Sequence, residues 1–280
     1  MGYHTQGKQL GGAPSNCIYH GIDKDIEGYV ITAVGDDENG REIMNRLKEL
    51  NVHTDFVQTT SEYPTGTVGV ELDEEGKPDY QIYENVAWDH IEWKEYLRKL
   101  AANLDGVCFG SLFQRNHVSR NTIHKFLEST NSSCTRVFDV NLRQGNYNRQ
   151  VILKSLERAD VVKLNEEELP VLSNYLGYTD ELEDVLQKLL KDYELHLIAY
   201  TKGSEGSLLM SQGDQSYMEV PDVKVADTIG AGDAFTGILL KGLLQGVDLR
   251  SIHQTSTEVA AYVCTQQAAT PKVTDDILKF

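Results

Sequence analysis

The most informative segment of this chain is Val225-Ala-Asp-Thr-Ile-Gly-Ala-Gly-Asp-Ala-Phe-Thr-Gly237. It begins as a strand-like run, passes through a glycine-containing turn and enters an apolar helix. Apolar residues recur along that helix at the three-to-four spacing of a buried face: Ala234, Phe235, Ile238, Leu239 and Leu243. We therefore expect a strand, a tight turn and a buried helix in direct succession.

The two glycines of this turn predict an anion site. Gly230 and Gly232 permit positive φ and carry no Cβ, so successive backbone N–H groups can converge on an anion at the helix start. A phosphoryl group in transfer spreads negative charge over its three equatorial oxygens, which preorganised N–H donors stabilise. The pattern favours an oxyanion cradle formed by Gly230, Ala231 and Gly232.

Asp233 follows the cradle in the first helical turn, where it could accept a proton from an attacking hydroxyl group. The helix dipole is expected to keep this carboxyl group ionised. The alternative is structural: Asp227 or Thr228 caps the helix, and the glycines only allow a sharp turn.

Composition narrows the class of protein. The chain has 280 residues and a formal charge of −17, with no run of lysines and arginines that reverses the sign locally, so nucleic-acid binding is not expected. No apolar run approaches the roughly 18 residues that span a bilayer, and the first residues do not resemble a secretory signal. Cysteine spacing indicates buried thiols: Cys17, Cys108, Cys134 and Cys264. A cytoplasmic location is therefore expected.

From Val107 onward, short apolar runs alternate with amphipathic stretches, which is typical of strands joined by crossover helices in a parallel sheet. The expected strands are Gly106–Gly110, Arg136–Val140, Asp160–Leu164 and Leu195–Thr201. The expected helices are Arg41–Leu50, Asn121–Ser129, Gln150–Arg158, Glu166–Asn174 and Asp180–Asp192.

A hairpin is expected before this alternation begins. Thr67–Leu72 and Tyr80–Tyr83 alternate in polarity and flank the turn-forming segment Asp73–Pro78. The hairpin, at about residues 64–89, could belong to a small second sheet that covers a cleft. A surface hairpin without a function is the alternative.

Asp227-Thr-Ile-Gly-Ala-Gly-Asp233 resembles the D-T-x-G-A-G-D signature of the ribokinase-like (PfkB) sugar kinases. The resemblance implies an α/β fold with a doubly wound, mostly parallel sheet flanked by helices and a small β-sheet lid, over one domain at residues 1–280. It also implies phosphoryl transfer from ATP to a sugar hydroxyl, with Asp233 as the base.

Further segments match the family in the same order. Gly11-Gly12 with Asn16 resembles a sugar-binding element, and Arg143, after the strand at Phe138-Asp-Val-Asn, could bind sugar or phosphate; a surface ion pair is its alternative. Val34–Gly40 resembles a Gly-Asp segment that caps a helix.

The nucleotide side of the resemblance rests on two loops. Asn165 and Glu168 resemble the N-x-x-E motif, in which Glu168 acts on Mg²⁺ through water. Thr201, Gly203 and Gly206 resemble the loop that lines the nucleotide site, together with Gly230 and Gly232. The family also suggests a monovalent cation, such as K⁺, near Asp227 and Thr228, and a homodimer formed through the lid sheet.

The identity of the sugar rests only on the resemblance of three segments to fructokinases. Pro64-Thr-Gly-Thr, Tyr83–Asp89 and Phe109–Arg115 look like fructokinases, which implies fructose 6-phosphate as the product. Other sugars and nucleosides remain alternatives.

Two departures from the family stand out. Its members begin with a strand carrying Gly-Glu and a sugar-binding aspartate, whereas only ten residues precede Gly11 here. We expect either a start further upstream or impaired activity, including a non-catalytic sugar or nucleotide sensor, with unpaired ladder groups where the strand would lie. Gln267-Ala-Ala269 also replaces the Gly-Ala common near the nucleotide.

Overall fold

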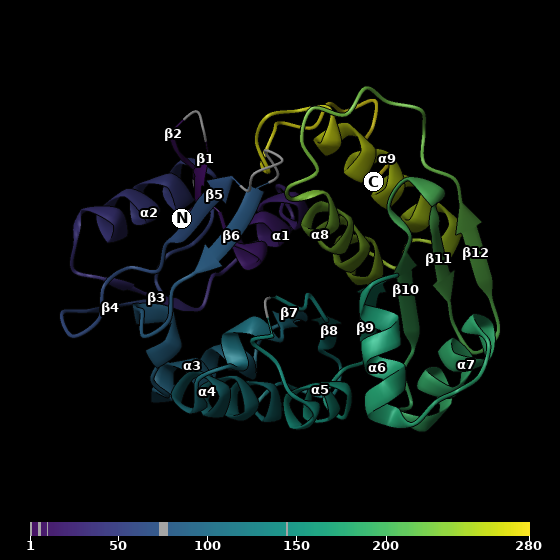
Figure 1. The fold of residues 1–280 in the computed structure, drawn as a ribbon, viewed down its shortest axis with the longest axis horizontal. Coiled ribbons are helices and arrows are strands. Elements are labelled where there is room, and N and C mark those ends of the chain that lie inside the picture. The colour runs from purple at the N-terminus through teal and green to yellow at the C-terminus, as the bar shows by residue number, and fades with distance from the viewer. Residues whose placement is uncertain (1, 5–6, 10, 73–77, 144) are drawn as a thin grey trace.

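The computed structural model describes the backbone of residues 2–4, 7–9, 11–72, 78–143 and 145–280, and the side chains of 11–69, 81–143 and 145–280 (Figure 1). The strands are β1 (Gly2–His4), β2 (Gly7–Gln9), β3 (Thr32–Gly35), β4 (Val57–Thr60), β5 (Val68–Leu72), β6 (Pro78–Ile82), β7 (Gly106–Gly110), β8 (Thr135–Asp139), β9 (Val161–Asn165), β10 (Leu197–Thr201), β11 (Ser207–Met210) and β12 (Gln215–Met218).

The α-helices are α1 (Ala13–Gly21), α2 (Glu38–Glu49), α3 (Glu95–Ala101), α4 (His117–Glu128), α5 (Arg149–Leu156), α6 (Glu168–Leu176), α7 (Leu182–Asp192), α8 (Ala231–Leu244) and α9 (Leu249–Cys264). Short 3-10 helices are η1 (Ala87–His90), η2 (Leu112–Gln114) and η3 (Gly203–Glu205).

The main sheet has six strands in the order β12-β11-β10-β9-β8-β7. Strands β7 to β10 are parallel, as the alternation of apolar runs and helices predicts, and β11 and β12 extend the sheet as an antiparallel hairpin. The predicted strands and helices from Gly106 to Asp192 are therefore confirmed, with ends that differ by a few residues.

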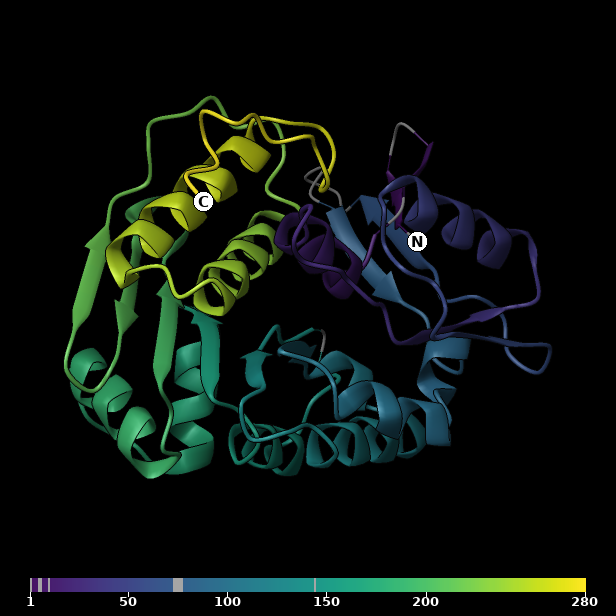
Figure 2. The same cartoon turned by 180° about the vertical axis from the view of Figure 1, so that it is seen from behind.

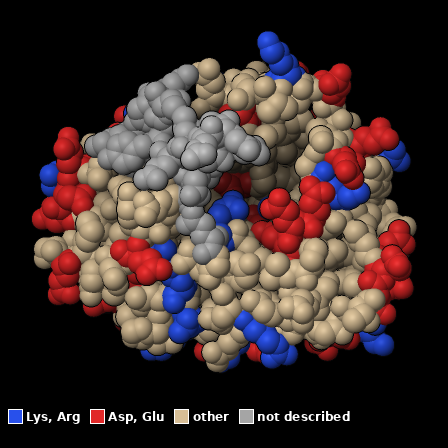
Figure 3. Space-filling model, in the orientation of Figure 1, with Lys and Arg blue, Asp and Glu red and all other residues tan. Residues whose placement is uncertain are grey.

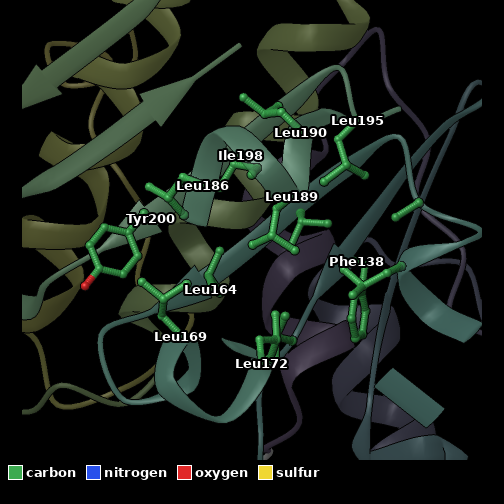
Figure 4. Packing of buried hydrophobic residues seen from close by; sticks show 14 of the residues in the cluster. Phe138, Leu164, Leu169, Leu172, Leu186, Leu189, Leu190, Leu195, Ile198 and Tyr200 are labelled. Atoms are coloured by element: carbon green, nitrogen blue, oxygen red, sulfur yellow. The ribbon is translucent and has the colours of Figure 1, made fainter. Parts of the chain in front are cut away.

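The two faces of this sheet are buried by different helices, because successive side chains along a strand point to opposite faces. On one face, Phe138, Val162, Leu164 and Ile198 pack with residues of α5, α6 and α7, and Figure 4 shows several of these side chains in contact. On the other face, Val137, Val161, Leu197 and Ala199 pack against Phe235 and Leu239 of α8 and Ile252 of α9. The helix that carries the glycine turn thus lies directly on the sheet.

The sheet does not continue into the N-terminal half of the described chain. Strands β3 and β4 form a separate two-stranded parallel sheet, and β7 ends the six-stranded sheet. Residues of β3 and of β7 line one and the same cavity. Among the described residues no strand pairs with both β3 and β7.

A four-stranded sheet forms in the order β2-β1-β5-β6. Its β5–β6 pair is the predicted antiparallel hairpin, whose turn at residues 73–77 lies outside the described residues. Strand β1 pairs with β2 and β5 there. Figures 1 and 2 show this sheet on the N-terminal side of the molecule, with α1 between it and α8.

One predicted element is wrong. The strand-like run before the glycine turn is not a strand: β12 ends at Met218, and residues 219–228 follow as an irregular segment. The amides of Ala226 and Asp227 donate to the carbonyl of Cys264 at the end of α9, at 2.8 and 3.2 Å. This segment is held by a helix end rather than by a sheet, so a run of strand-forming residues was insufficient to make a strand.

Candidate active site

Helix α8 begins with a left-handed glycine. Gly230 is the N-cap residue, with φ 84°, and no side chain caps it. A Cβ at this position would lie 2.5 Å from the Cβ of Ala269, so space as well as φ requires glycine here. Asp227 accepts from the amide of Ile229 at 3.0 Å, which caps the preceding turn and not the helix. The side-chain capping alternative is therefore not what forms; the amide of Ala231 donates to the carbonyl oxygen of Thr228 at 3.4 Å.

Helix α1 packs against α8 through a backbone contact. A Cβ on Gly237 would lie 2.3 Å from the carbonyl oxygen of Cys17, a distance that no side chain tolerates. This close approach places Asn16 of α1 beside Asp233 of α8, where its Nδ2 donates to Oδ2 of Asp233 at 2.8 Å. Asn16 is buried, and its Oδ1 has no hydrogen-bond partner among the described residues. Two predicted site residues, 217 positions apart in sequence, thus meet at the start of α8.

The charge state of Asp233 is set by its surroundings. Burial raises the pKa of its carboxyl group, and the negative charge of Asp139 raises it further. The hydrogen bond from Asn16 and the positive charges of Lys163 and Arg143 lower the pKa but do not cancel the rise. The raised pKa makes Asp233 a stronger base than the helix dipole alone would predict.

A cavity of about 1500 Å³ opens at this point. Its lining includes every predicted site residue except Asp227: Gly11, Gly12, Asn16, Arg143, Asn165, Glu168, Thr201, Gly203, Gly206, Thr228, Gly230, Ala231, Gly232 and Asp233. Figure 3 shows a hollow near the centre of one face, with acidic side chains and a small basic patch beside it. Motifs that are far apart in the sequence thus line one cavity.

Glu168 and Asn165 are joined by reciprocal side-chain to backbone hydrogen bonds at the end of β9. One carboxylate oxygen of Glu168 accepts from the amide of Leu142 and the other from the amide of Asn165, each at 2.9 Å. The side-chain oxygen of Asn165 accepts from the amides of Glu167 and Glu168. Burial raises the pKa of Glu168, and Lys163 opposes that rise. These contacts fix the turn that carries both residues.

The other predicted site residues lie at strand ends and in loops. Arg143 is exposed and donates to the carbonyl of the adjacent Leu142. Thr201 ends β10, and the loop that follows turns through Gly203 and Gly206, which both have positive φ. Asp37 caps α2 by accepting from the amide of Gly40 and also binds Thr65, so the helix-capping interpretation of Val34–Gly40 is confirmed.

Sequence reasoning missed three buried polar residues behind the cradle. Lys163, Asp139 and Thr236 are joined to one another below the first turn of α8. The signal was available: a lysine within the apolar run Val161-Val-Lys-Leu and an aspartate after Val137-Phe each share the face of their strand that carries a valine.

Known proteins of similar sequence carry out the kind of reaction that this geometry suggests. The family model "pfkB family carbohydrate kinase" matches residues 3–276. The chain is a member of the pfkB family. It is 30% identical to a fructokinase of Salmonella typhimurium over 94% of this chain and 86% of the relative.

Solved structures place this pfkB kinase among proteins of the same fold. The uncharacterized sugar kinase PH1459 from Pyrococcus horikoshii superposes with a TM-score of 0.81 and 28% identity, covering 96% of this chain and 87% of that one. A fructokinase with bound ATP from Xylella fastidiosa gives 0.84 at 22% identity, covering 96% and 89%. The expected ribokinase-like α/β fold is confirmed.

The protein is therefore a sugar kinase, a phosphotransferase that acts on a sugar hydroxyl group. Its four cysteines are free thiols, of which Cys17 and Cys134 are buried. None of the helices in the described part of the chain is long and apolar enough to cross a bilayer.

Proposed function

We propose that this kinase transfers the γ-phosphoryl group of ATP to fructose and forms fructose 6-phosphate. The observation that carries the proposal is the pairing of Asn16 with Asp233 at the uncapped start of α8, inside the cavity. The choice of fructose is supported by relatives named fructokinase, including those of Salmonella typhimurium and Vibrio alginolyticus.

In this proposal Asp233 accepts the proton of the attacking hydroxyl group while the amides of Gly230, Ala231 and Gly232 stabilise the charge on the transferred phosphoryl group. Its raised pKa suits the role of base. Asn16 orients the carboxylate and has a free Oδ1 to accept from a sugar hydroxyl group, beside Gly11 and Gly12. Arg143 contributes positive charge near the sugar and phosphate.

The nucleotide would bind between the loop of Thr201, Gly203 and Gly206 and the start of α8, with Asn165 at its phosphates. Mg²⁺ would neutralise phosphate charge there. Glu168 fits an ion held through water, because backbone amides already occupy both of its oxygens. In the described residues there is no group of three or more acidic, histidine or cysteine side chains that could hold a metal ion.

Three further expectations belong to this proposal. A monovalent cation such as K⁺ would order the turn at Asp227 and Thr228, before the cradle. Residues 1–280 would act as one kinase domain in the cytoplasm, with the hairpin at about 64–89 as a lid over the cavity that Thr65 and Val68 line. The lid sheet would also serve as the interface of a homodimer.

A substrate panel tests the proposal. ADP release is measured with MgATP and fructose, fructose 6-phosphate, ribose or adenosine, and the product is identified by ³¹P NMR. We expect the highest kcat/KM with fructose and a phosphate ester on its 6-hydroxyl group. A higher kcat/KM with adenosine would assign a nucleoside kinase, and no turnover with any acceptor would reject the proposed reaction.

A second candidate is a non-catalytic sugar or nucleotide sensor, since no strand among the described residues joins the sheet of β3 and β4 to β7. Retention of Asp233 argues against it, since a sensor needs no base. Tight binding of fructose or ATP by calorimetry without any ADP release would establish the sensor.

A further inference from the structure

Two opposite charges lie side by side in the main sheet behind the cradle. Asp139 ends β8, and the ladder pairs it directly with Lys163 of β9. The Nζ of Lys163 donates to Oδ1 of Asp139 at 3.1 Å, and both residues are buried, at 6% and 5% exposure. A buried ion pair of this kind costs more desolvation energy than its attraction returns unless further hydrogen bonds complete it, so a stability role alone is a poor explanation.

Both side chains face α8. Each lies two residues after a valine, Val137 or Val161, that packs against α8 in the apolar core. The other carboxylate oxygen of Asp139 accepts from Oγ1 of Thr236 in α8 at 2.9 Å, and the same hydroxyl oxygen lies 2.9 Å from the carbonyl of Gly232. Thr236 has no exposed surface. The ion pair is thus hydrogen-bonded to Thr236, in the second turn of α8.

Lys163 also touches that turn directly. A Cβ on Gly232 would lie 3.1 Å from the Nζ of Lys163, so the ammonium group sits against the glycine next to Asp233. Lys163 lines the cavity together with Gly232 and Asp233. A permanent positive charge is therefore fixed beside the base, on the sheet side of the helix start.

We propose that Lys163 and Asp139 are a positioning pair for the kinase reaction: they fix the start of α8 to the sheet and place two opposite charges beside Asp233. The inference rests on the proposed role of Asp233 as the base. Lys163 and Asp139 act on Asp233 and Gly232 and do not contact the reacting atoms themselves.

The charges around Asp233 support this role. Asp139 raises the pKa of Asp233, whereas Lys163 and Arg143 lower it. Burial would lower the pKa of Lys163, but the carboxylates of Asp139, Glu168 and Asp233 together raise it, so the ammonium group stays charged. On α1, the buried Cys17 thiol has a raised pKa and remains neutral. Of the charges that act on Asp233, those of Lys163 and Asp139 come from a single buried pair.

The test follows the carboxyl ¹³C signal of Asp233 during a pH titration, in protein labelled at aspartate carboxyl carbons and with Asp233→Asn used to assign the signal. Lys163→Met should move the midpoint upward by about one pH unit or more, because a neighbouring positive charge is lost. Asp139→Asn should move it downward. The acid limb of kcat/KM should shift in the same direction in each variant, with kcat reduced about tenfold or more and KM for ATP little changed.

Lys241→Met is the matched control. Lys241 is another buried lysine, near the C-terminal end of α8. It forms an ion pair with Asp23 at 2.8 Å, away from the first turn of the helix. Its replacement should leave the Asp233 midpoint unchanged. Unmoved midpoints in Lys163→Met and Asp139→Asn, or shifts in the same direction, would overturn the proposal. If Lys163→Met does not fold, the near-isosteric Asp139→Asn decides alone.

The titration needs no turnover, so it separates the two proposals. A protein that phosphorylates no sugar would reject the proposed reaction while the opposite midpoint shifts still supported the positioning pair. Normal turnover with unmoved Asp233 midpoints would support the proposed reaction and reject the positioning pair.

Discussion

The two halves of this kinase are secured by different means. In the C-terminal half, a continuous six-stranded sheet is covered on both faces, and the loops that we propose bind the nucleotide follow the ends of its strands. In the N-terminal half, β3 and β4 pair with no other strand of the described residues, and α1 carries Asn16, which we propose binds the sugar. The start of α8 belongs to both halves, because the sheet holds it from one side and α1 from the other. The proposed catalytic geometry therefore depends most on the contacts made to α8.

The largest effect should come from separating the halves at the α1–α8 contact. Gly237→Val would place side-chain atoms against the carbonyl of Cys17, where even a Cβ would lie at 2.3 Å. We expect a loss of about 3 kcal/mol in the free energy of unfolding, measured with urea, together with loss of activity. Gly213→Ala is the control, since nothing lies within 4 Å of its added Cβ. Equal stability of the two variants would show that α1 does not depend on this close approach.

A second effect should be confined to the C-terminal half. His253 is fully buried between Ser207 and Ser216, and burial lowers its pKa to about 4. The unfolded chain binds a proton there near pH 6.5, so stability is present above that pH and is lost as the pH falls towards 4.

The corresponding measurement compares urea unfolding at pH 7 and pH 5. His253→Gln should remove about 2 kcal/mol of the stability difference between the two conditions. His53→Gln, at a side chain that is 43% exposed, should leave the difference unchanged. An unaltered difference in His253→Gln would mean that the buried histidine does not control acid stability.

The smallest effect is expected in the N-terminal half, at the base of the lid. Asp37 caps α2 and accepts from both the amide and the hydroxyl group of Thr65, which precedes β5. Asp37→Ala should cost about 1 kcal/mol of stability. It should raise KM for the sugar more than KM for ATP, because the lid side is loosened. Asp36→Ala, at an exposed neighbour, should change neither. A larger rise in KM for ATP would contradict the assignment of this side to the sugar.

The parts of the fold that sequence could predict are those with local signals. The alternation of apolar runs and amphipathic helices gave β7 to β10 and α4 to α7, and the glycines of the GAGD turn located the start of α8. The hairpin of β11 and β12 was missed because its strands are short and the apolar run that leads to α8 was taken for a strand.

For the site, motif order predicted which residues line the cavity, but not which of them touch. The Asn16–Asp233 bond depends on the glycine contact between α1 and α8, and the Asp139–Lys163 pair depends on strand register. Neither is visible without tertiary structure. The carboxylate of Asp227 caps a turn outside the cavity lining, and the cation expected near the backbone carbonyls of Asp227 and Thr228 stays a prediction.

The central claim is that Asp233 receives the proton while the amides at the start of α8 hold the transferred phosphoryl group. Its most direct test is Asp233→Asn, assayed for ADP release with MgATP and fructose and for ATP affinity by calorimetry. We expect kcat to fall about 10²- to 10⁴-fold with ATP affinity retained and stability at neutral pH undiminished, since the ionised carboxyl group is disfavoured by burial. Turnover within about tenfold of the unaltered enzyme would contradict the account.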